Sequence, residues 1–232
     1  MNSFLLQIPL TTDSLSAPVI TEKTLSVIDL ITSGGIGGNL VMGALGLLSI
    51  FAIYILIERF SAIRKASIED DAFLKSIQNF VEAKDIAAAK TLCRNTDSPI
   101  SRMIEKGVNR INKPMTDISA AIENQGKLEV FKMENNLANL ATISGAAPMI
   151  GFLGTVIGMI VAFHEMASAG GNIDVEMLSK GIYTAMTTTV AGLIVGIIAF
   201  IAYNYLVSKV DKVVFMLEAK TTEFLDLLHH NE

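Results

Sequence analysis

The sequence has no tryptophan, a single cysteine and few charged residues for its length of 232. The lone Cys93 excludes an internal disulfide and supplies no zinc or redox motif. Only 18% of the residues are charged, whereas 51% are hydrophobic and the mean hydropathy is +0.49. This balance is typical of an integral membrane protein and not of a soluble domain.

The residues of the common enzyme sites are missing as well. There is no glycine-rich phosphate loop, no Ser/His/Asp set and no basic patch for nucleic acid. His164 and Glu165 are interpreted as a pair at a membrane end, and His229-His230 as a tail without further metal ligands. The sequence therefore predicts a protein that is not an enzyme and that holds no cofactor or metal and binds no nucleic acid.

Three long apolar runs are present, each with enough residues to cross a hydrocarbon core of about 30 Å. They predict an all-α membrane protein with three transmembrane helices and long cytoplasmic helical extensions. The predicted segments are an N-terminal arm with a surface helix (1–36), span one (37–58), a cytoplasmic helical region (59–136), span two (137–163), a short loop (164–180), span three (181–205) and a C-terminal helix (206–232).

The distribution of lysine and arginine predicts the orientation of these spans. Residues 59–136 and 206–232 hold 16 of the 18 basic residues, and the other two are Lys23 and Lys180. The positive-inside rule places the basic-rich regions in the cytoplasm. The N-terminal arm and the loop 164–180 then lie in the periplasm, and the C-terminus is cytoplasmic.

The cytoplasmic region has the periodicity of several helices. Apolar spacing predicts helices over 70–84, over 86–94 with Asp85 as cap, and from Ser98-Pro99 to Ile111. From Asp117 the pattern continues without a proline as far as Pro148, which predicts one unbroken helix rising into span two. We expect the glycines at 34–38 to end the surface helix before span one. We expect Glu123/Lys127 and Glu129/Lys132 to be solvated helix pairs or subunit contacts.

Small residues recur through spans two and three. A helix that only crosses lipid needs none of them, but a stripe of small residues lets another backbone come close. We therefore interpret this set as a packing surface around a partner helix: Ala147, Pro148, Gly151, Gly154, Gly158, Gly192 and Gly196.

Hydroxyls are the only candidates for transport chemistry in the same spans, because no Asp, Glu, Lys, Arg or His lies in their interior. One interpretation is purely structural, with each threonine bonded to a carbonyl of the preceding turn. The other is a hydroxyl-lined ion pathway, for which a partner would have to supply the carboxylate. The candidates for the pathway are Thr155, Thr184, Thr188 and Thr189.

Several motifs resemble the ExbB/TolQ/MotA proton-channel family. They are Glu58-Arg59-Phe60 at the end of span one, Ala147-Pro148 followed by Gly151 to Ile160, and Gly181-Ile182 to Leu193 in span three. Three spans are similar to the ExbB/TolQ branch, with ExbB ahead of TolQ, and not to the four-span MotA branch. Within this resemblance Thr155 and Thr189 match the pore threonines of the family.

The resemblance implies a particular assembly. It implies a pentamer in the bacterial inner membrane around two copies of a single-span ExbD/TolR-like partner that carries an intramembrane aspartate. It also implies that proton motive force works on a TonB-like periplasm-spanning protein for outer-membrane transport. A TolQ-like subunit of a Tol-Pal-type system and a non-conducting scaffold are the alternatives.

One position departs from the family pattern. Thr184 stands where relatives commonly carry a glutamate in the third span. This departure weakens the expectation of a relay with two carboxylates. Protons remain the expected ion, with sodium as an alternative.

Overall fold

A computed structural model describes residues 35–67, 71–168 and 175–230. The described residues form seven helices and no strand. The helices are α2 (Gly35–Ala66), α3 (Asp71–Glu82), α4 (Ile86–Asn95), α5 (Pro99–Val108), α6 (Met115–Glu134), α7 (Leu137–Ser168) and α8 (Val175–His230).

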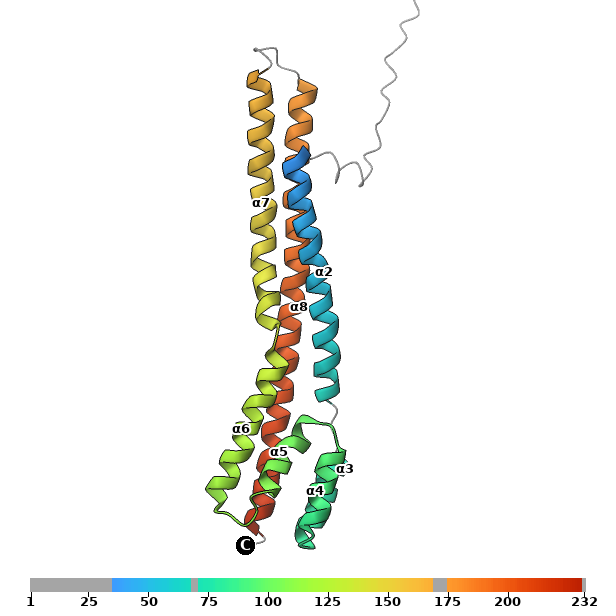
Figure 1. The fold of residues 1–232 in the computed structure, drawn as a ribbon, viewed down its shortest axis with the longest axis vertical. Coiled ribbons are helices and arrows are strands. Elements are labelled where there is room, and N and C mark those ends of the chain that lie inside the picture. Colours follow the sequence, from blue (N-terminus) through green and yellow to red (C-terminus); the bar gives the residue numbers. More distant parts are fainter. Residues whose placement is uncertain (1–34, 68–70, 169–174, 231–232) are drawn as a thin grey trace, which may run out of the picture.

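The helices form an elongated rod around α8, which runs along its full length (Figure 1). At the upper end α7 and α2 pack on α8, and at the lower end α3 to α6 surround it. We call α7 with residues 175–205 of α8 the paired spans, and α3 to α6 with residues 206–230 of α8 the lower bundle. α2, the α6–α7 segment and α8 are each long and apolar enough to cross a membrane, which confirms the predicted all-α fold with three spans.

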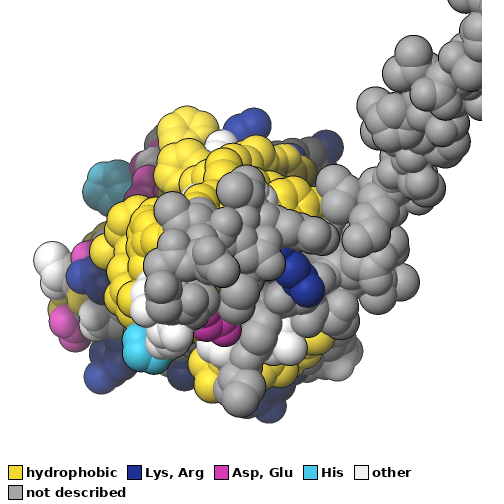
Figure 2. Space-filling view, turned by 90° about the horizontal axis from the view of Figure 1, so that it is seen from above, with side chains coloured by type: hydrophobic (Ala, Val, Ile, Leu, Met, Phe, Trp, Pro, Cys, Tyr) yellow, Lys and Arg dark blue, Asp and Glu magenta, His cyan; other side chains and the backbone are white. Residues whose placement is uncertain are grey.

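The apolar surface of the upper half faces outward. Only 22% to 28% of the most apolar window of each long helix is buried within the chain. In the end-on view, hydrophobic side chains cover most of the surface that the grey residues leave visible (Figure 2). An apolar surface of this extent fits contact with lipid or with other membrane helices.

The helices of the lower bundle begin where the sequence supplies caps. The Asp85 carboxylate accepts a hydrogen bond of 2.9 Å from the Ala88 N–H and so caps α4. Ser98 and Ser101 form a reciprocal capping box at the start of α5, with Pro99 in the first turn. Both starts agree with the predicted helices, whereas α5 ends at Val108 and not at Ile111.

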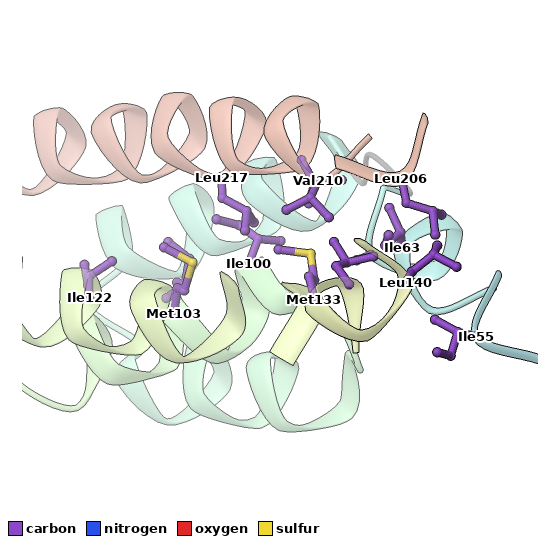
Figure 3. Close-up of a cluster of buried hydrophobic side chains, with 14 of the residues drawn as sticks. Ile55, Ile63, Ile100, Met103, Ile122, Met133, Leu140, Leu206, Val210 and Leu217 are labelled. Atoms are coloured by element: carbon purple, nitrogen blue, oxygen red, sulfur yellow. The ribbon is translucent and has the colours of Figure 1, made fainter. Parts of the chain in front are cut away.

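One apolar core joins the two halves of the rod. Leu206, Val210 and Leu217 of α8 point toward side chains of α2, α5, α6 and α7 (Figure 3). Met133 and Leu140 lie on either side of the junction between α6 and α7, and both are buried. Large apolar side chains therefore hold the lower bundle and the base of the paired spans together.

The predicted unbroken helix from Asp117 into span two is wrong. α6 ends at Glu134 and α7 begins at Leu137, because Asn136 adopts a φ of +65°. Asparagine tolerates this left-handed conformation better than most residues, since its short polar side chain can bond locally. Asn136 indeed accepts through its carbonyl from Leu140 N–H at 3.2 Å and through Oδ1 from Asn139 Nδ2 at 3.3 Å.

Other boundaries also differ from the predictions. Gly37 and Gly38 lie inside α2, and α2 continues eight residues beyond Glu58 to Ala66. The end that these glycines were expected to give the surface helix stays a prediction. α7 extends to Ser168 and α8 starts at Val175, so both ends of the predicted loop 164–180 are helical. The predicted surface helix of the N-terminal arm lies outside the described residues.

Candidate ion pathway between α7 and α8

The two paired spans approach each other backbone to backbone. A Cβ atom added at Gly151 of α7 would lie 2.7 Å from the Thr188 carbonyl oxygen of α8. A Cβ added at Gly192 would lie 2.6 Å from the Ala147 carbonyl oxygen. Neither position can carry a side chain unless the helices separate, so glycine here is what permits the close contact.

The rest of the predicted packing surface continues this contact along the pair. A Cβ at Gly158 would meet the Ala185 Cβ at 2.8 Å, and one at Gly196 would meet Pro148 Cγ at 2.6 Å. A Cβ at Gly154 would meet Thr188 Oγ1 at 2.6 Å and Val41 of α2 at 2.9 Å. The small residues therefore pack the chain's own helices, and their predicted role around a partner helix stays a prediction.

Thr155 and Thr189 form the centre of the candidate site. Their hydroxyls contact each other across the two helices. Thr155 Oγ1 also lies 3.0 Å from the Ala185 carbonyl oxygen, and Thr189 Oγ1 lies 3.2 Å from the Gly151 carbonyl oxygen. Both threonines are partly exposed, so the pair is accessible from outside the chain.

The hydroxyl pair has spare acceptors and no spare donor. Each threonine supplies one proton and two lone pairs. One proton is used between the two hydroxyls, and the other can be donated to the Ala185 or the Gly151 carbonyl. The unused lone pairs then make the pair a hydrogen-bond acceptor toward any group that approaches from outside.

Thr188 and Thr184 occupy a different environment. Thr188 is 2% exposed, and its hydroxyl lies 2.7 Å from the Ala185 carbonyl and 3.1 Å from the Gly151 carbonyl. Thr184 is 9% exposed and donates to the Gly181 carbonyl of its own helix. The chain's own helices bury these two threonines, and their role as pore-lining residues stays a prediction.

Charge is absent from this part of the chain. Within the described residues, no group of three His, Cys, Asp or Glu side chains could hold a metal ion. The stretches 137–163 and 181–205 contain no ionisable acid or base apart from tyrosine. Near Thr155 and Thr189, hydroxyls and main-chain carbonyls are therefore the polar groups that these stretches can offer to an ion or to a partner's side chain.

A buried ionic cluster lies below the paired spans, and the sequence interpretation missed it. Glu129 of α6 is 2% exposed and accepts hydrogen bonds from Arg102 Nη2 at 2.7 Å, Gln125 Nε2 at 2.8 Å and Lys132 Nζ at 2.9 Å. The expectation of a solvated Glu129/Lys132 pair is therefore wrong. Arg102 also binds Asp97 at 2.7 Å, and Asp97 binds Lys65 of α2 at 2.6 Å.

The cluster keeps Glu129 ionised. Burial acts to raise the pKa of Glu129, but the hydrogen bonds from Arg102 and Lys132 and the charge of Arg102 outweigh it, so the pKa lies below its ordinary value. The recurrence of Gln125, Glu129 and Lys132 on one helix face was the available sequence signal. It did not reveal that α5 would cover that face.

Comparisons with known proteins agree with this architecture. Residues 95–219 match the MotA/TolQ/ExbB proton channel family. A biopolymer transport protein ExbB homolog of Methanothermobacter thermautotrophicus is 28% identical over 80% of this chain and 64% of its own length. The Tol-Pal system protein TolQ of Pseudomonas aeruginosa is 25% identical over 91% of this chain and 96% of its own.

A further relative matches a shorter segment more strongly. The biopolymer transport protein ExbB of Helicobacter pylori is 40% identical over 34% of this chain and 54% of its own length. The chain thus spans less than two thirds of the archaeal and the Helicobacter relatives. Because the family match covers more than half of the chain and includes both paired spans, the chain belongs to the MotA/TolQ/ExbB proton channel family and is an integral membrane protein.

Proposed function

We propose that the chain is an ExbB-like subunit of a proton-driven complex in the bacterial inner membrane, which converts proton motive force into work on a TonB-like protein for outer-membrane transport. In this proposal the chain is not an enzyme and needs no cofactor, since the ion itself is the transported species. The relatives named ExbB support this branch.

The observation that carries the proposal is the Thr155–Thr189 hydroxyl pair. Because both protons can be used within the cluster, one between the hydroxyls and one on a carbonyl, the pair can accept a hydrogen bond from a protonated carboxyl group. When that carboxyl loses its proton, a hydroxyl can turn to donate to the carboxylate instead. The Ala185 or Gly151 carbonyl then loses one hydrogen bond while the carboxylate gains one, so the net change in free energy is small.

Residues 137–163 and 181–205 carry no carboxyl group of their own, so the proposal needs a partner. We assign that role to two copies of a single-span ExbD/TolR-like protein with an aspartate at the depth of Thr155 and Thr189. A pentamer of this chain would surround them. In this arrangement the N-terminus is periplasmic and the C-terminus cytoplasmic, which agrees with 16 of 18 basic residues lying in 59–136 and 206–232.

We propose the proton as the ion. Thr184, which replaces the third-span glutamate common in relatives, is buried and bonded to its own helix, so it supplies no second titrating group. The partner's aspartate is then the sole proton carrier. Sodium is the second candidate, because hydroxyl and carbonyl oxygens also coordinate hard cations.

A TolQ-like role in a Tol-Pal-type system is the second candidate function. The specific observation in its favour is the alignment with the Pseudomonas TolQ, which covers nearly the whole of both chains. A non-conducting scaffold is the third candidate, in which the threonines serve only for packing.

The test is ion flux in proteoliposomes with three preparations: this chain alone, this chain with its single-span partner, and the same complex with the partner's membrane aspartate changed to asparagine. We expect flux only in the second preparation, driven by a pH gradient. Flux that follows a sodium gradient would show that sodium and not the proton is the transported ion, and would leave the proposed pathway unchanged. Equal flux with the asparagine partner would contradict the proposal.

A further inference from the structure

The break between α6 and α7 leaves a main-chain acceptor without its helical donor. In an unbroken helix the Lys132 carbonyl would accept from the Asn136 N–H, four residues later. Asn136 has a φ of +65°, and the last helical bond of α6 runs from the Asn135 N–H to the Phe131 carbonyl at 3.1 Å. A carbonyl freed at a helix break needs another donor, from water or from a side chain.

A side chain from a different helix supplies that donor. Arg59 of α2 donates from Nη1 to the Lys132 carbonyl oxygen at 2.8 Å, across 73 residues of sequence. Arg59 is 8% exposed, which is rare for an arginine unless its charge is paired. Its pairing partner is Glu58, which accepts from Arg59 Nε at 2.6 Å and also from Nη2.

Lys132 in turn connects the break to the buried cluster, since its Nζ donates to Glu129 at 2.9 Å while its carbonyl accepts from Arg59. The break is therefore bound from α2 through a main-chain carbonyl, and α2 packs on α7 as well.

We infer that Arg59 is a positioning residue that fixes the joint between the lower bundle and the paired spans. Its guanidinium binds the Lys132 carbonyl while Glu58 holds it in place, so α2, α6 and α7 keep one relative orientation. An arginine suits this task because its planar fork can serve a carboxylate and a carbonyl together. A lysine could donate to one of the two but not hold both in fixed geometry.

The experiment measures the joint itself and does not depend on ion conduction, so it stands even if the proposed function fails. Spin labels are placed at Asn124→Cys on α6 and Thr142→Cys on α7, both exposed positions, in a Cys93→Ala background. Labelled chain is diluted into unlabelled chain before reconstitution in lipid vesicles, and the distance distribution across the joint is measured by pulsed electron resonance. Arg59→Gln is compared with Arg64→Gln, an exposed arginine on the same helix.

We expect Arg59→Gln to broaden the distribution, Arg59→Lys to broaden it less, and Arg64→Gln to leave it as in the unmodified chain. The same change in an Asn136→Ala background should broaden it less, because a continuous helix gives the Lys132 carbonyl a main-chain donor again. If Arg59 acted only by packing, Arg59→Gln would broaden the distance distribution equally in both backgrounds, and that result would overturn the inference. An unchanged distribution in Arg59→Gln, or equal broadening in Arg64→Gln, would overturn the inference.

If Arg59→Gln does not fold, Arg59→Lys and Arg64→Lys replace the glutamine variants in the same comparison. Broadening in the first and not in the second supports the inference. The same width in Arg59→Lys as in the unmodified chain contradicts it, because lysine cannot bind Glu58 and the Lys132 carbonyl together in a fixed geometry.

Discussion

The upper and lower parts of α8 are held by opposite means. Between residues 181 and 205 its contact surface includes Gly192, Gly196 and threonine hydroxyls. There the backbone of α7 comes into direct contact with that of α8. Between residues 206 and 228 the buried positions are large, among them Leu206, Leu217 and Phe224. One continuous helix therefore changes its mode of packing along its length.

The difference follows from the two solvents. In lipid, removing an apolar side chain from hydrocarbon gains little, so helices associate through close contact and hydrogen bonds. In water, burying large apolar side chains supplies most of the free energy. The packing of the upper part of α8 thus depends on the close fit of small residues. The packing of the lower part depends on the apolar area that is buried.

The largest expected effect comes from breaking the close contact in the upper part. Gly151→Leu places a side chain 2.7 Å from the Thr188 carbonyl, so we expect α7 and α8 to separate and the folded chain to be lost. Gly145→Leu is the matched control, because a Cβ there meets nothing within 4 Å in the chain. Thermal unfolding in detergent distinguishes the two, and equal loss in both would contradict the account.

A smaller effect is expected from emptying space in the lower part. Leu217 is 2% exposed, and Leu217→Ala should reduce the free energy of unfolding by about 2–5 kcal/mol, from lost burial and the cavity left behind. Phe215→Ala on the same helix is the control, since Phe215 is 74% exposed. Denaturant unfolding monitored by helicity measures both, and a loss of stability in Phe215→Ala as large as in Leu217→Ala would argue against a buried-area mechanism.

The smallest effect concerns acid. Because the pKa of Glu129 is below its ordinary value in the folded chain, its contribution to stability is complete above that ordinary value and is lost as the pH falls through the folded pKa. We expect the lower bundle to lose stability in mild acid, and Glu129→Gln to flatten this dependence. A pH series of unfolding midpoints tests this, and an identical slope in the variant would show that other carboxylates are responsible.

The fold was largely predictable from sequence because its signals are local. Apolar runs set the three spans, and the caps at Asp85 and Ser98 set the starts of α4 and α5. The break at Asn136 was missed because no proline or glycine marks it. The tandem Asn135-Asn136 was the one available signal, since asparagine tolerates positive φ.

The candidate site was only half predictable. The small residues Gly151 and Gly192 indicated that two helix backbones would come into contact. The sequence pattern does not show whether the second backbone belongs to the same chain. Helical spacing likewise placed Thr188 and Thr184 on one face without showing that the chain's own helices bury them. Burial of Glu129 depends on α5, whose Arg102 lies 27 residues away in sequence, so no local pattern could reveal it.

The most direct test of the pathway compares proton flux through the reconstituted complex when both hydroxyls of the pair are removed and when a nearby hydroxyl is removed. The double variant Thr155→Val with Thr189→Val should lower flux at least about tenfold, equivalent to about 1.4 kcal/mol in the barrier, while assembly with the partner persists. Thr187→Val should conduct normally, because that hydroxyl bonds only to the Tyr183 carbonyl of its own helix. An assembled double variant that conducts like the unmodified complex would contradict the assignment of Thr155 and Thr189 to the ion pathway.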